Sequence, residues 1–319
     1  MNKGTLISVV TLLLLMILLP LFSLCSSGED LRPFVTYTDV DYDFTVYDPK
    51  TDTVNGYSAQ DYVFGVVAAE MDINYHDEAL KAQAVSAYTL ALYKKDMRAK
   101  KPDKSIKYAD LSADYTKDQA FITREQAYEK WGNKASEYES KLDNIINLVK
   151  DKVIMYDGKI IQSVYHDTSS GKTESAENMW GSSIPYLVSV QSVGDLLNPH
   201  YVSSLSISYD EFSNKLSDYI TNDVEKIKTT VNIAERTPSG TVTDFVVGDK
   251  HLTGKEIRSI FLLKSANFDI EFTASSVNFT VRGYGHGVGM SQYGANVMAQ
   301  QGSDYQSILK WYYQGCEII

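Results

Sequence analysis

Hydrophobic and polar positions divide the chain into one long apolar run and a series of shorter amphipathic stretches. Residues 5–25 are mostly apolar and carry no charge, and about 20 such residues span the hydrocarbon core of a bilayer as a helix. Residues 32–57 are rich in Val, Tyr and Thr and alternate as in Phe44-Thr45-Val46-Tyr47, which is typical of strands. The pattern therefore predicts a membrane helix followed by the first strands of a folded domain.

Two helices are predicted after these strands. Ser58 stands three residues before Asp61, an arrangement that starts helices, and this helix is expected to end near Glu70-Met71. The second helix begins at the acidic turn Asp77-Glu78, which suits the helix dipole, and it runs to about Arg98. One face of this helix is apolar at helical spacing, and it consists of Leu80, Ala84, Ala87 and Ala91.

The rest of the chain mixes strands and helices without regular βαβ alternation. The patterns predict a loop at 101–118, a helix at 123–150 and a hairpin at 153–163 that turns at Asp157-Gly158. They further predict helix in the middle of 203–231, strands over most of 241–281, and a glycine-rich loop at 283–294 that leads into a helix through Gln300, which Gly302 stops. Ser303 is expected to cap a last short helix that reaches Tyr312. This mixture predicts an α+β fold with mainly antiparallel strands, in one large domain of one or two lobes.

Charges around the apolar run set the expected topology. Lys3 precedes the run, whereas Glu29 and Asp30 follow it, and positive charge favours the cytoplasmic side. We therefore expect residues 1–30 to be a cytoplasmic stub and an uncleaved single-pass anchor in the cell membrane, and residues 31–319 to lie outside the cytoplasm. The main alternative is a secretory signal peptide, which has a shorter apolar stretch and a small-residue cleavage site that Ser23-Leu24-Cys25 matches poorly.

Composition excludes several function classes. The formal net charge is −11, which argues against nucleic acid as a partner because phosphate binding needs a basic surface. Cys25 and Cys316 are the two cysteines, and a bridge between them is not expected, so the domain is no disulfide scaffold. The five histidines form no HExxH motif or other metal-ligand spacing. We predict no metal site and no cofactor, and the sequence leaves the oligomeric state open.

Glu70 is the first candidate for chemistry. It is the only charged residue between Asp61 and Asp72, at the end of Val66-Val67-Ala68-Ala69. A carboxyl group in apolar surroundings keeps its proton to higher pH and can then serve as a general acid. The alternative reading is a glutamate at a helix end that faces solvent.

Two loops carry further candidate residues. Residues 163–190 gather small hydroxyl side chains with His166 and Lys172, as a sugar-binding loop would, and Trp180 or Tyr186 offers a ring for a pyranose face; an ordinary polar loop is the alternative. A Ser-His-Asp triad is disfavoured because no GxSxG elbow is present. Residues 283–295, GYGHGVGMSQYGA, contain five glycines that let the backbone approach a ligand closely, although a purely structural loop fits equally well.

Together, these segments resemble the stage II sporulation protein D family, and the resemblance extends from about Asp30 to Ile319. The family's ordered motifs stand in this chain at Asp61–Met71, Glu78–Val85, Thr168–Trp180 and Gly285–Ala295. The resemblance implies a lytic transglycosylase that cleaves the MurNAc–GlcNAc bond of peptidoglycan, leaves a 1,6-anhydro-MurNAc end, and prefers strands stripped of stem peptides. Glu70 then falls on the catalytic acid/base. The expected substrate-binding residues of the groove are Gln83, Tyr88, His166, Thr168, Ser169, Ser170, Lys172, Trp180, His286, Ser291, Gln292 and Tyr293.

The resemblance also implies partners and leaves alternatives. It implies action during forespore engulfment, beside an amidase/endopeptidase (stage II sporulation protein P) and a membrane protein (stage II sporulation protein M). A non-catalytic glycan-binding module that stimulates a partner cell-wall amidase is the second reading, and a scaffold of a sporulation complex is the third.

Two positions depart from the family pattern. Relatives commonly carry Arg where this chain has Tyr88, which predicts an altered pH optimum and weaker glycan affinity, unless Tyr88 only fills the core beside Val85 and Leu92. Some relatives bind a metal through Cys and His in the segment that corresponds to residues 111–121, and no Cys or His remains there.

Overall fold

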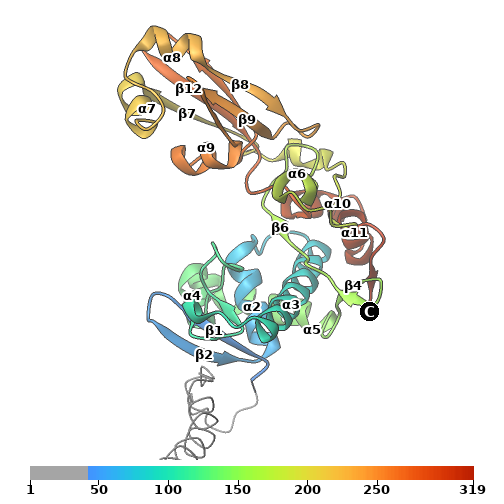
Figure 1. Cartoon of the computed structure of the whole chain (residues 1–319). Helices are drawn as coiled ribbons and strands as arrows, with labels where there is room; N and C mark the ends of the chain where they lie inside the picture. The colour runs from blue at the N-terminus through green and yellow to red at the C-terminus, as the bar shows by residue number, and fades with distance from the viewer. Residues whose placement is uncertain (1–41) are drawn as a thin grey trace, which may run out of the picture. The chain divides into compact units, whose positions relative to one another are not determined.

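A computed structural model describes residues 42–319 of the chain (Figure 1). The expected membrane anchor at residues 1–30 lies outside this range. Among residues 42–319, no helix combines the length and the apolar character that crossing a bilayer requires. The description therefore concerns the expected extracytoplasmic part, which is α+β as predicted, with antiparallel pairing in most of its strand ladders.

The first lobe begins with a hairpin and two helices, as the alternation predicts. Strand β1 (Phe44–Asp48) pairs antiparallel with β2 (Thr53–Tyr57) and parallel with the short β3 (Leu111–Ser112). Helix α2 (Ala59–Glu70) starts at Ser58, whose hydroxyl accepts a hydrogen bond from Asp61 N. Helix α3 (Asp77–Lys100) packs against it.

The predicted helix over 123–150 is broken in two. Helix α4 (Arg124–Trp131) ends where Gly132 takes a φ of 57°, a left-handed value that interrupts an α-helix and suits glycine. A short 3₁₀ turn, η2 (Gly132–Lys134), then leads into α5 (Ala135–Leu148), whose apolar stripe packs on α2 and α3. A single long helix is therefore wrong for this stretch.

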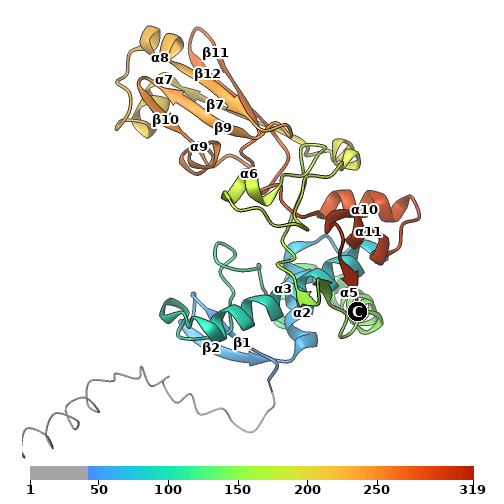
Figure 2. The same ribbon diagram turned by 45° about the vertical axis from the view of Figure 1, so that its right-hand side comes forward.

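The end of the chain returns to the first lobe (Figure 2). The hairpin of β4 (Ile154–Tyr156) and β5 (Lys159–Ile160) turns at Asp157-Gly158 as predicted, and β14 (Glu317–Ile318) pairs with β4. Helices α10 (Gln292–Gln300) and α11 (Tyr305–Tyr312) pack on α3. The cap of α11 is Asp304, which accepts from Ser307 N; the prediction that Ser303 caps it is off by one residue.

A second hydrophobic core lies in residues 202–282, where Ile, Leu and Val side chains pack around phenylalanine rings that include Phe212, Phe245, Phe268 and Phe279. It is enclosed by two three-stranded antiparallel sheets and three helices. Their bounds are β7 (Val202–Ser208), α7 (Tyr209–Lys215), α8 (Val224–Thr230), β8 (Val231–Arg236), β9 (Val242–Val247), β10 (Lys250–Leu252), α9 (Gly254–Phe261), β11 (Phe268–Phe272) and β12 (Ser276–Arg282).

The pattern in this second lobe was predicted only in part. Helix lies within 203–231 as expected, but the stretch also opens with β7 and ends in β8. The strands expected over 241–281 are interrupted by α9, which starts at a capping box of Thr253 and Glu256. That signal (Thr followed three residues later by Glu) is visible in the sequence, and the surrounding β-branched residues masked it.

The segments that connect the two lobes contact each other, and they bring together two loops that lie far apart in the sequence. Strand β6 (Tyr165–His166) pairs in parallel with β13 (Met290–Ser291), and single bridges join Thr168 to Tyr284 and Glu174 to Val288. The joint also contains α6 (Ala176–Trp180) and the 3₁₀ turn η3 (Val193–Leu197), while η1 (Lys104–Ile106) lies in the first lobe. Residues 163–190 and 283–295 therefore form one structure.

Candidate functional site

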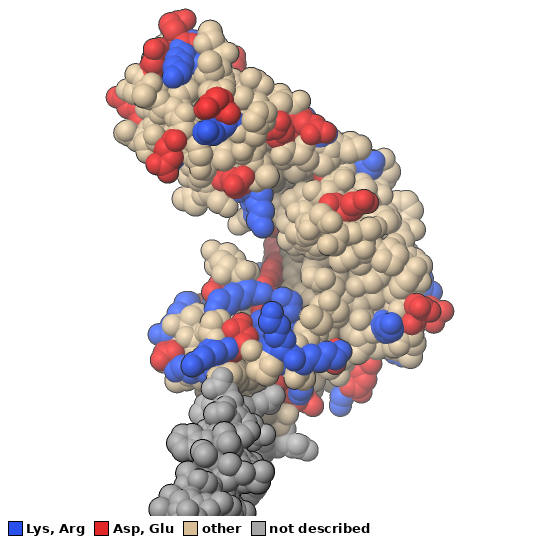
Figure 3. Space-filling view, in the orientation of Figure 1, with Lys and Arg blue, Asp and Glu red and all other residues tan. Residues whose placement is uncertain are grey.

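A groove of about 1150 Å³ runs along this joint and is lined by both lobes. Figure 3 shows it as a hollow with Lys and Arg side chains on both rims. Of the residues predicted for the site, the groove brings together Glu70, His166, Trp180, His286 and Gln292. Its other walls come from the C-terminal half of α3, residues 111–120, residues 162–167 and residues 258–264.

Glu70 is the last residue of α2 and points its carboxyl group into the groove. Its Oε1 accepts a hydrogen bond of 2.7 Å from the backbone N–H of Ala120. Burial raises the pKa of Glu70; the Ala120 N–H lowers it, and the negative charge of Asp167 raises it further. The net upward shift of this pKa favours a protonated carboxyl, as the apolar flank of Glu70 predicts.

Amide and phenol side chains surround Glu70. The Gln292 side chain lies close enough to Glu70 to lower its pKa, and its Nε2 donates to Gln83 Oε1 at 3.4 Å. On the loop side, Tyr165 Oη donates to Gln119 Oε1 at 2.7 Å. None of these groups is charged at neutral pH, so none of them forms an ion pair with the Glu70 carboxylate.

An aromatic cluster forms another part of the groove wall. The His286 ring lies 5.7 Å from the Trp180 ring and 5.8 Å from the His166 ring, measured between centroids. Burial lowers the pKa of His166 to about 3 and that of His286 to about 4. Both imidazoles are therefore neutral near pH 7. His166 is buried, whereas His286 and the indole of Trp180 are part-exposed and offer ring faces of the kind on which sugars stack.

The hydroxyl groups expected to hold sugar are instead used inside the protein. Ser169 donates to the carboxylate of Asp195 through its backbone N–H at 2.9 Å and through its hydroxyl, and Ser291 Oγ donates to Asp195 Oδ1 at 2.7 Å. Ser170 Oγ donates to the Ser239 carbonyl at 2.8 Å. Thr168 Oγ1 donates to Asp167. These four hydroxyl groups are thus hydrogen-bonded within the protein and lie outside the lining of the groove.

Four other predicted binding residues also lie away from the groove wall, namely Gln83, Tyr88, Lys172 and Tyr293. Gln83 is fully buried behind Gln292, and the Tyr293 hydroxyl donates to the Leu197 carbonyl at 3.0 Å. Lys172 lines a separate depression of about 20 Å³.

Tyr88 stands on the other side of α3. It lines a small depression of about 40 Å³ with Ala59 and Val63, and its ring packs edge-on against Phe44 at 6.2 Å. This position favours the core-filling reading of Tyr88 and removes the basis for a direct effect on Glu70.

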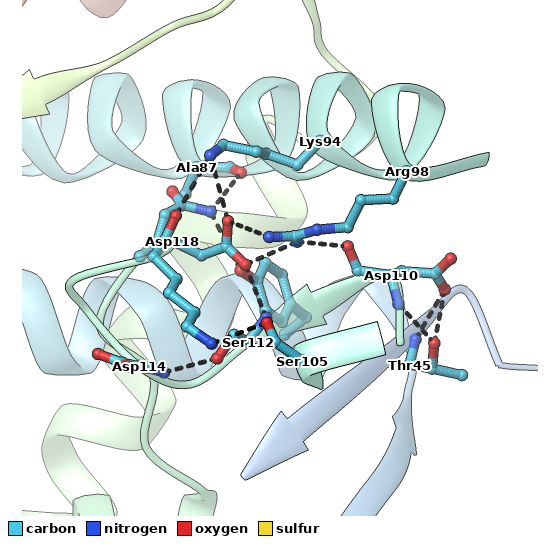
Figure 4. A network of polar contacts seen from close by, with 12 residues as sticks. Thr45, Ala87, Lys94, Arg98, Ser105, Asp110, Ser112, Asp114 and Asp118 are labelled. Atoms are coloured by element: carbon cyan, nitrogen blue, oxygen red, sulfur yellow. Dashed lines mark hydrogen bonds and ion pairs between the residues drawn. The ribbon is translucent and has the colours of Figure 1, made fainter. Parts of the chain in front are cut away.

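An ion-pair network fixes the loop that carries Ala120 (Figure 4). Arg98 on α3 binds the carboxylate of Asp118 through two nitrogens, at 2.7 and 3.0 Å, and Lys94 adds a contact of 3.3 Å. Asp118 also accepts from Ser112 N at 2.7 Å, and its side chain is only 1% exposed. This network holds residues 111–121 against α3, and residues 42–319 contain no His, Cys, Asp and Glu cluster suited to a metal ion.

We expect Asp118→Ala to lower the free energy of unfolding by about 2 kcal/mol, because charged hydrogen-bond donors lose a buried partner. It should also reduce activity, since Ala120 would no longer hold Glu70. Asp114→Ala, in the same loop but without a contact to Arg98, is the control; equal destabilisation by both substitutions would contradict this role of Asp118.

Addition of EDTA to the wild-type protein should change neither its melting temperature nor its activity.

The sequence analysis missed three groups of the groove and its support. Asp167 lines the groove beside Glu70, and Arg258 and Lys264 line it from the second lobe. Asp195 is completely buried beneath it. Asp167 had a visible signal, because it follows His166 in a polar segment, whereas nothing near Arg258 or Lys264 in the sequence connects them to residues more than 80 positions away.

Comparisons with known proteins find similarity to sporulation proteins and to an amidase enhancer. A family model described as stage II sporulation protein matches residues 47–156. The chain is 37% identical to stage II sporulation protein D of Bacillus amyloliquefaciens over 273 residues, which cover 86% of this chain and 77% of that protein. It is 36% identical to the Bacillus subtilis protein of the same name over 278 residues, or 86% and 78% of the two chains. An amidase enhancer of Bacillus subtilis is 26% identical over 304 residues, which cover 79% of this chain and 39% of that protein.

Proposed function

Since the chain belongs to the stage II sporulation protein D family, we propose that it is a lytic transglycosylase of the bacterial cell wall. The observation that carries the proposal is Glu70, a carboxyl group with a raised pKa in a groove lined by aromatic rings and amides. A raised pKa is what a general acid needs near neutral pH. The groove of about 1150 Å³ has room for several sugar rings.

The proposed reaction uses one carboxyl group twice. Protonated Glu70 donates its proton to the glycosidic oxygen of a MurNAc–GlcNAc bond as the bond between that oxygen and C1 of MurNAc breaks. The C6 hydroxyl of the same MurNAc then attacks C1, and the Glu70 carboxylate accepts the hydroxyl proton. The products are a GlcNAc-terminated strand and a 1,6-anhydro-MurNAc end, and Glu70 is protonated again. Because the nucleophile is part of the substrate, no water has to be positioned.

Mass spectrometry of reaction products tests this proposal. The full-length protein, purified in detergent, is incubated with glycan strands freed of stem peptides. Anhydro-muramic ends support the proposal. Reducing muramic ends would instead mean hydrolysis, in which Glu70 and Asp167 would act as a carboxyl pair, and intact glycan after prolonged incubation would contradict any cleavage.

A substitution of Asp167 should move the pH profile. The negative charge of Asp167 raises the pKa of Glu70, so Asp167→Asn should lower this pKa. The acid form of Glu70 is then lost at lower pH, and the alkaline limb of kcat/KM should shift to lower pH. Asp72→Asn removes an exposed charge near the end of α2 and serves as the control. An unmoved limb in Asp167→Asn, or an equal shift in Asp72→Asn, would refute the coupling.

A second function has a specific observation in its favour. The similarity to a protein named amidase enhancer covers 79% of this chain, which suits a glycan-binding module that stimulates a cell-wall amidase. Such a module would bind peptide-free glycan and increase the amidase rate with Glu70→Gln as effectively as with Glu70. Dependence of the stimulation on Glu70 would favour the enzyme.

We also propose that residues 1–30 anchor the protein in the cell membrane with its N-terminus in the cytoplasm, in a complex with an amidase/endopeptidase and a membrane protein during engulfment. The uncharged run at 5–25 and Lys3 before it support this topology. Protease treatment of intact protoplasts tests it, because an exposed domain is digested while a cytoplasmic one is protected.

A further inference from the structure

A buried amide side chain lies next to the residue that hydrogen-bonds Glu70. Gln119 directly precedes Ala120 in the loop 111–121 and is only 4% exposed. Its carboxamide makes three hydrogen bonds, each with a different part of the fold, and the partners are Tyr165 Oη of β6 at 2.7 Å, Tyr62 Oη of α2 at 3.1 Å and the Ala87 carbonyl of α3 at 3.2 Å. Gln119 therefore connects the loop to both helices and to the joint between the lobes.

These three bonds admit one orientation of the Gln119 amide. The Ala87 carbonyl can only accept a hydrogen bond, so the amide nitrogen must face it and Oε1 must face Tyr165. The Tyr165 hydroxyl is then the donor to Oε1. Burial raises the pKa of Tyr62 and of Tyr165, so both phenols keep their protons near pH 7 and all three bonds are present there.

The bonds of Gln119 also fix the peptide unit that follows it. The N–H of this unit is the Ala120 N–H, which donates to Glu70 Oε1 at 2.7 Å. Because a peptide unit is planar and rigid, a rotation of the Gln119 backbone would turn this N–H away from the carboxyl group. Asp118 holds the loop against α3 through Arg98, whereas the Gln119 side chain opposes that rotation.

We propose that Gln119 is a positioning residue for Glu70 and that Oε2 of Glu70 is the oxygen that transfers the proton. This rests on the proposed function. In a protonated carboxyl group, an N–H donates to the carbonyl oxygen and not to the hydroxyl oxygen. Since the Ala120 N–H occupies Oε1, the proton of Glu70 is on Oε2. Oε2 then donates it to the glycosidic oxygen and later accepts the proton of the C6 hydroxyl.

The Ala120 N–H favours the carboxylate form, because it lowers the pKa of Glu70. Other charges act on the same group: Asp167 of the joint raises this pKa, and Lys130 of α4 lowers it. Asp118, in the loop itself, is held in ion pairs with α3. An uncharged substitution of Gln119 leaves all of these charges in place, so its effect on the pKa of Glu70 reports the direction of the Ala120 N–H.

Gln119→Met tests the proposal, because it keeps nearly the same side-chain volume and removes all three hydrogen bonds. The pKa of Glu70 should rise, and the alkaline limb of kcat/KM should move to higher pH. The value of kcat should fall by on the order of tenfold, since Oε2 is no longer held in place, while KM should change little. Carbon-13 NMR of the full-length protein, labelled at the glutamate carboxyl carbons, measures the pKa directly, and Glu70→Gln identifies the resonance.

Two further variants accompany Gln119→Met. Thr89→Val also removes a buried hydrogen-bonding group, because the Thr89 hydroxyl bonds the Val85 carbonyl and Ile154 N. Thr89 lies outside the groove lining, so this control should leave the pKa of Glu70 unchanged. Tyr62→Phe removes one of the three bonds and keeps the ring, so it should raise the pKa by less. It also tests the proposal if Gln119→Met does not fold.

The direction of the shift separates positioning from a merely structural role. If loss of the Gln119 bonds only loosened the loop, water would reach Glu70 and its pKa would fall. An unchanged or lowered pKa, or the same rise in Thr89→Val, would therefore overturn the proposal. The NMR measurement does not depend on cleavage. A raised pKa in Gln119→Met, with no anhydro ends from the wild-type protein, would support the positioning and defeat the reaction. Anhydro ends with an unchanged pKa would do the reverse.

Discussion

Glu70→Gln is expected to abolish glycan cleavage while leaving glycan binding nearly unchanged. The substitution removes the one proton that the proposed reaction transfers, and general acid–base catalysis typically contributes about 10²–10⁴-fold to a rate. The Gln side chain keeps an oxygen that can accept the Ala120 N–H bond. Release of anhydro-muramic ends, followed by mass spectrometry, is the measurement. Glu129→Gln, an exposed glutamate on α4, is the matched control and should retain full activity.

The same variant should be more stable than the wild-type protein at neutral pH. Burial raises the pKa of Glu70 above its value in the unfolded chain, so stability falls as the pH rises from the unfolded pKa through the folded one. Gln has no proton to lose and escapes this penalty. A melting temperature of Glu70→Gln that exceeds wild type above this pH interval and equals it below would agree. Near-normal cleavage by Glu70→Gln would show that another group is the acid.

Asp195→Ala is expected to destabilise the joint between the lobes by about 3 kcal/mol, because it leaves several buried donors without an acceptor. Asp195 accepts hydrogen bonds from Ser169 and Ser291. It thereby ties the loop at 168–171 to the start of α10. Its loss should therefore reduce both the free energy of unfolding in urea and the affinity for glycan.

Two control substitutions separate the effect of the side-chain volume of Asp195 from the effect of its hydrogen bonds. Asp195→Asn keeps the volume and one acceptor oxygen, so it should cost less than Asp195→Ala. Asp218→Ala removes an exposed carboxylate in the second lobe and should stay within about 0.5 kcal/mol of wild type. Equal stability of Asp195→Ala and Asp218→Ala would show that the serines find other partners and that Asp195 does not hold the joint.

Local patterns predicted the elements whose signals lie within a few residues. The cap at Ser58 and the acidic start of α3 gave helices at the expected places, and the turn at Asp157-Gly158 gave the hairpin. The apolar flank of Glu70 also predicted the upward direction of its pKa, because helix neighbours supply part of its surroundings. The prediction of one helix over residues 123–150 was wrong, because a charged and regular pattern does not reveal that Gly132 adopts a left-handed φ.

Only the tertiary structure decided which polar side chains can contact a ligand. Ser169 and Ser291 appear free in the sequence, but both donate their hydroxyl groups to Asp195. Arg258 resembles an ordinary helix residue in the sequence, but the fold places it in the wall of the groove. A buried polar group must find a partner within about 3 Å, and partners that close are set by packing between segments far apart in the chain. Sequence spacing therefore identifies candidate side chains, and only the packing determines which of them are hydrogen-bonded within the protein.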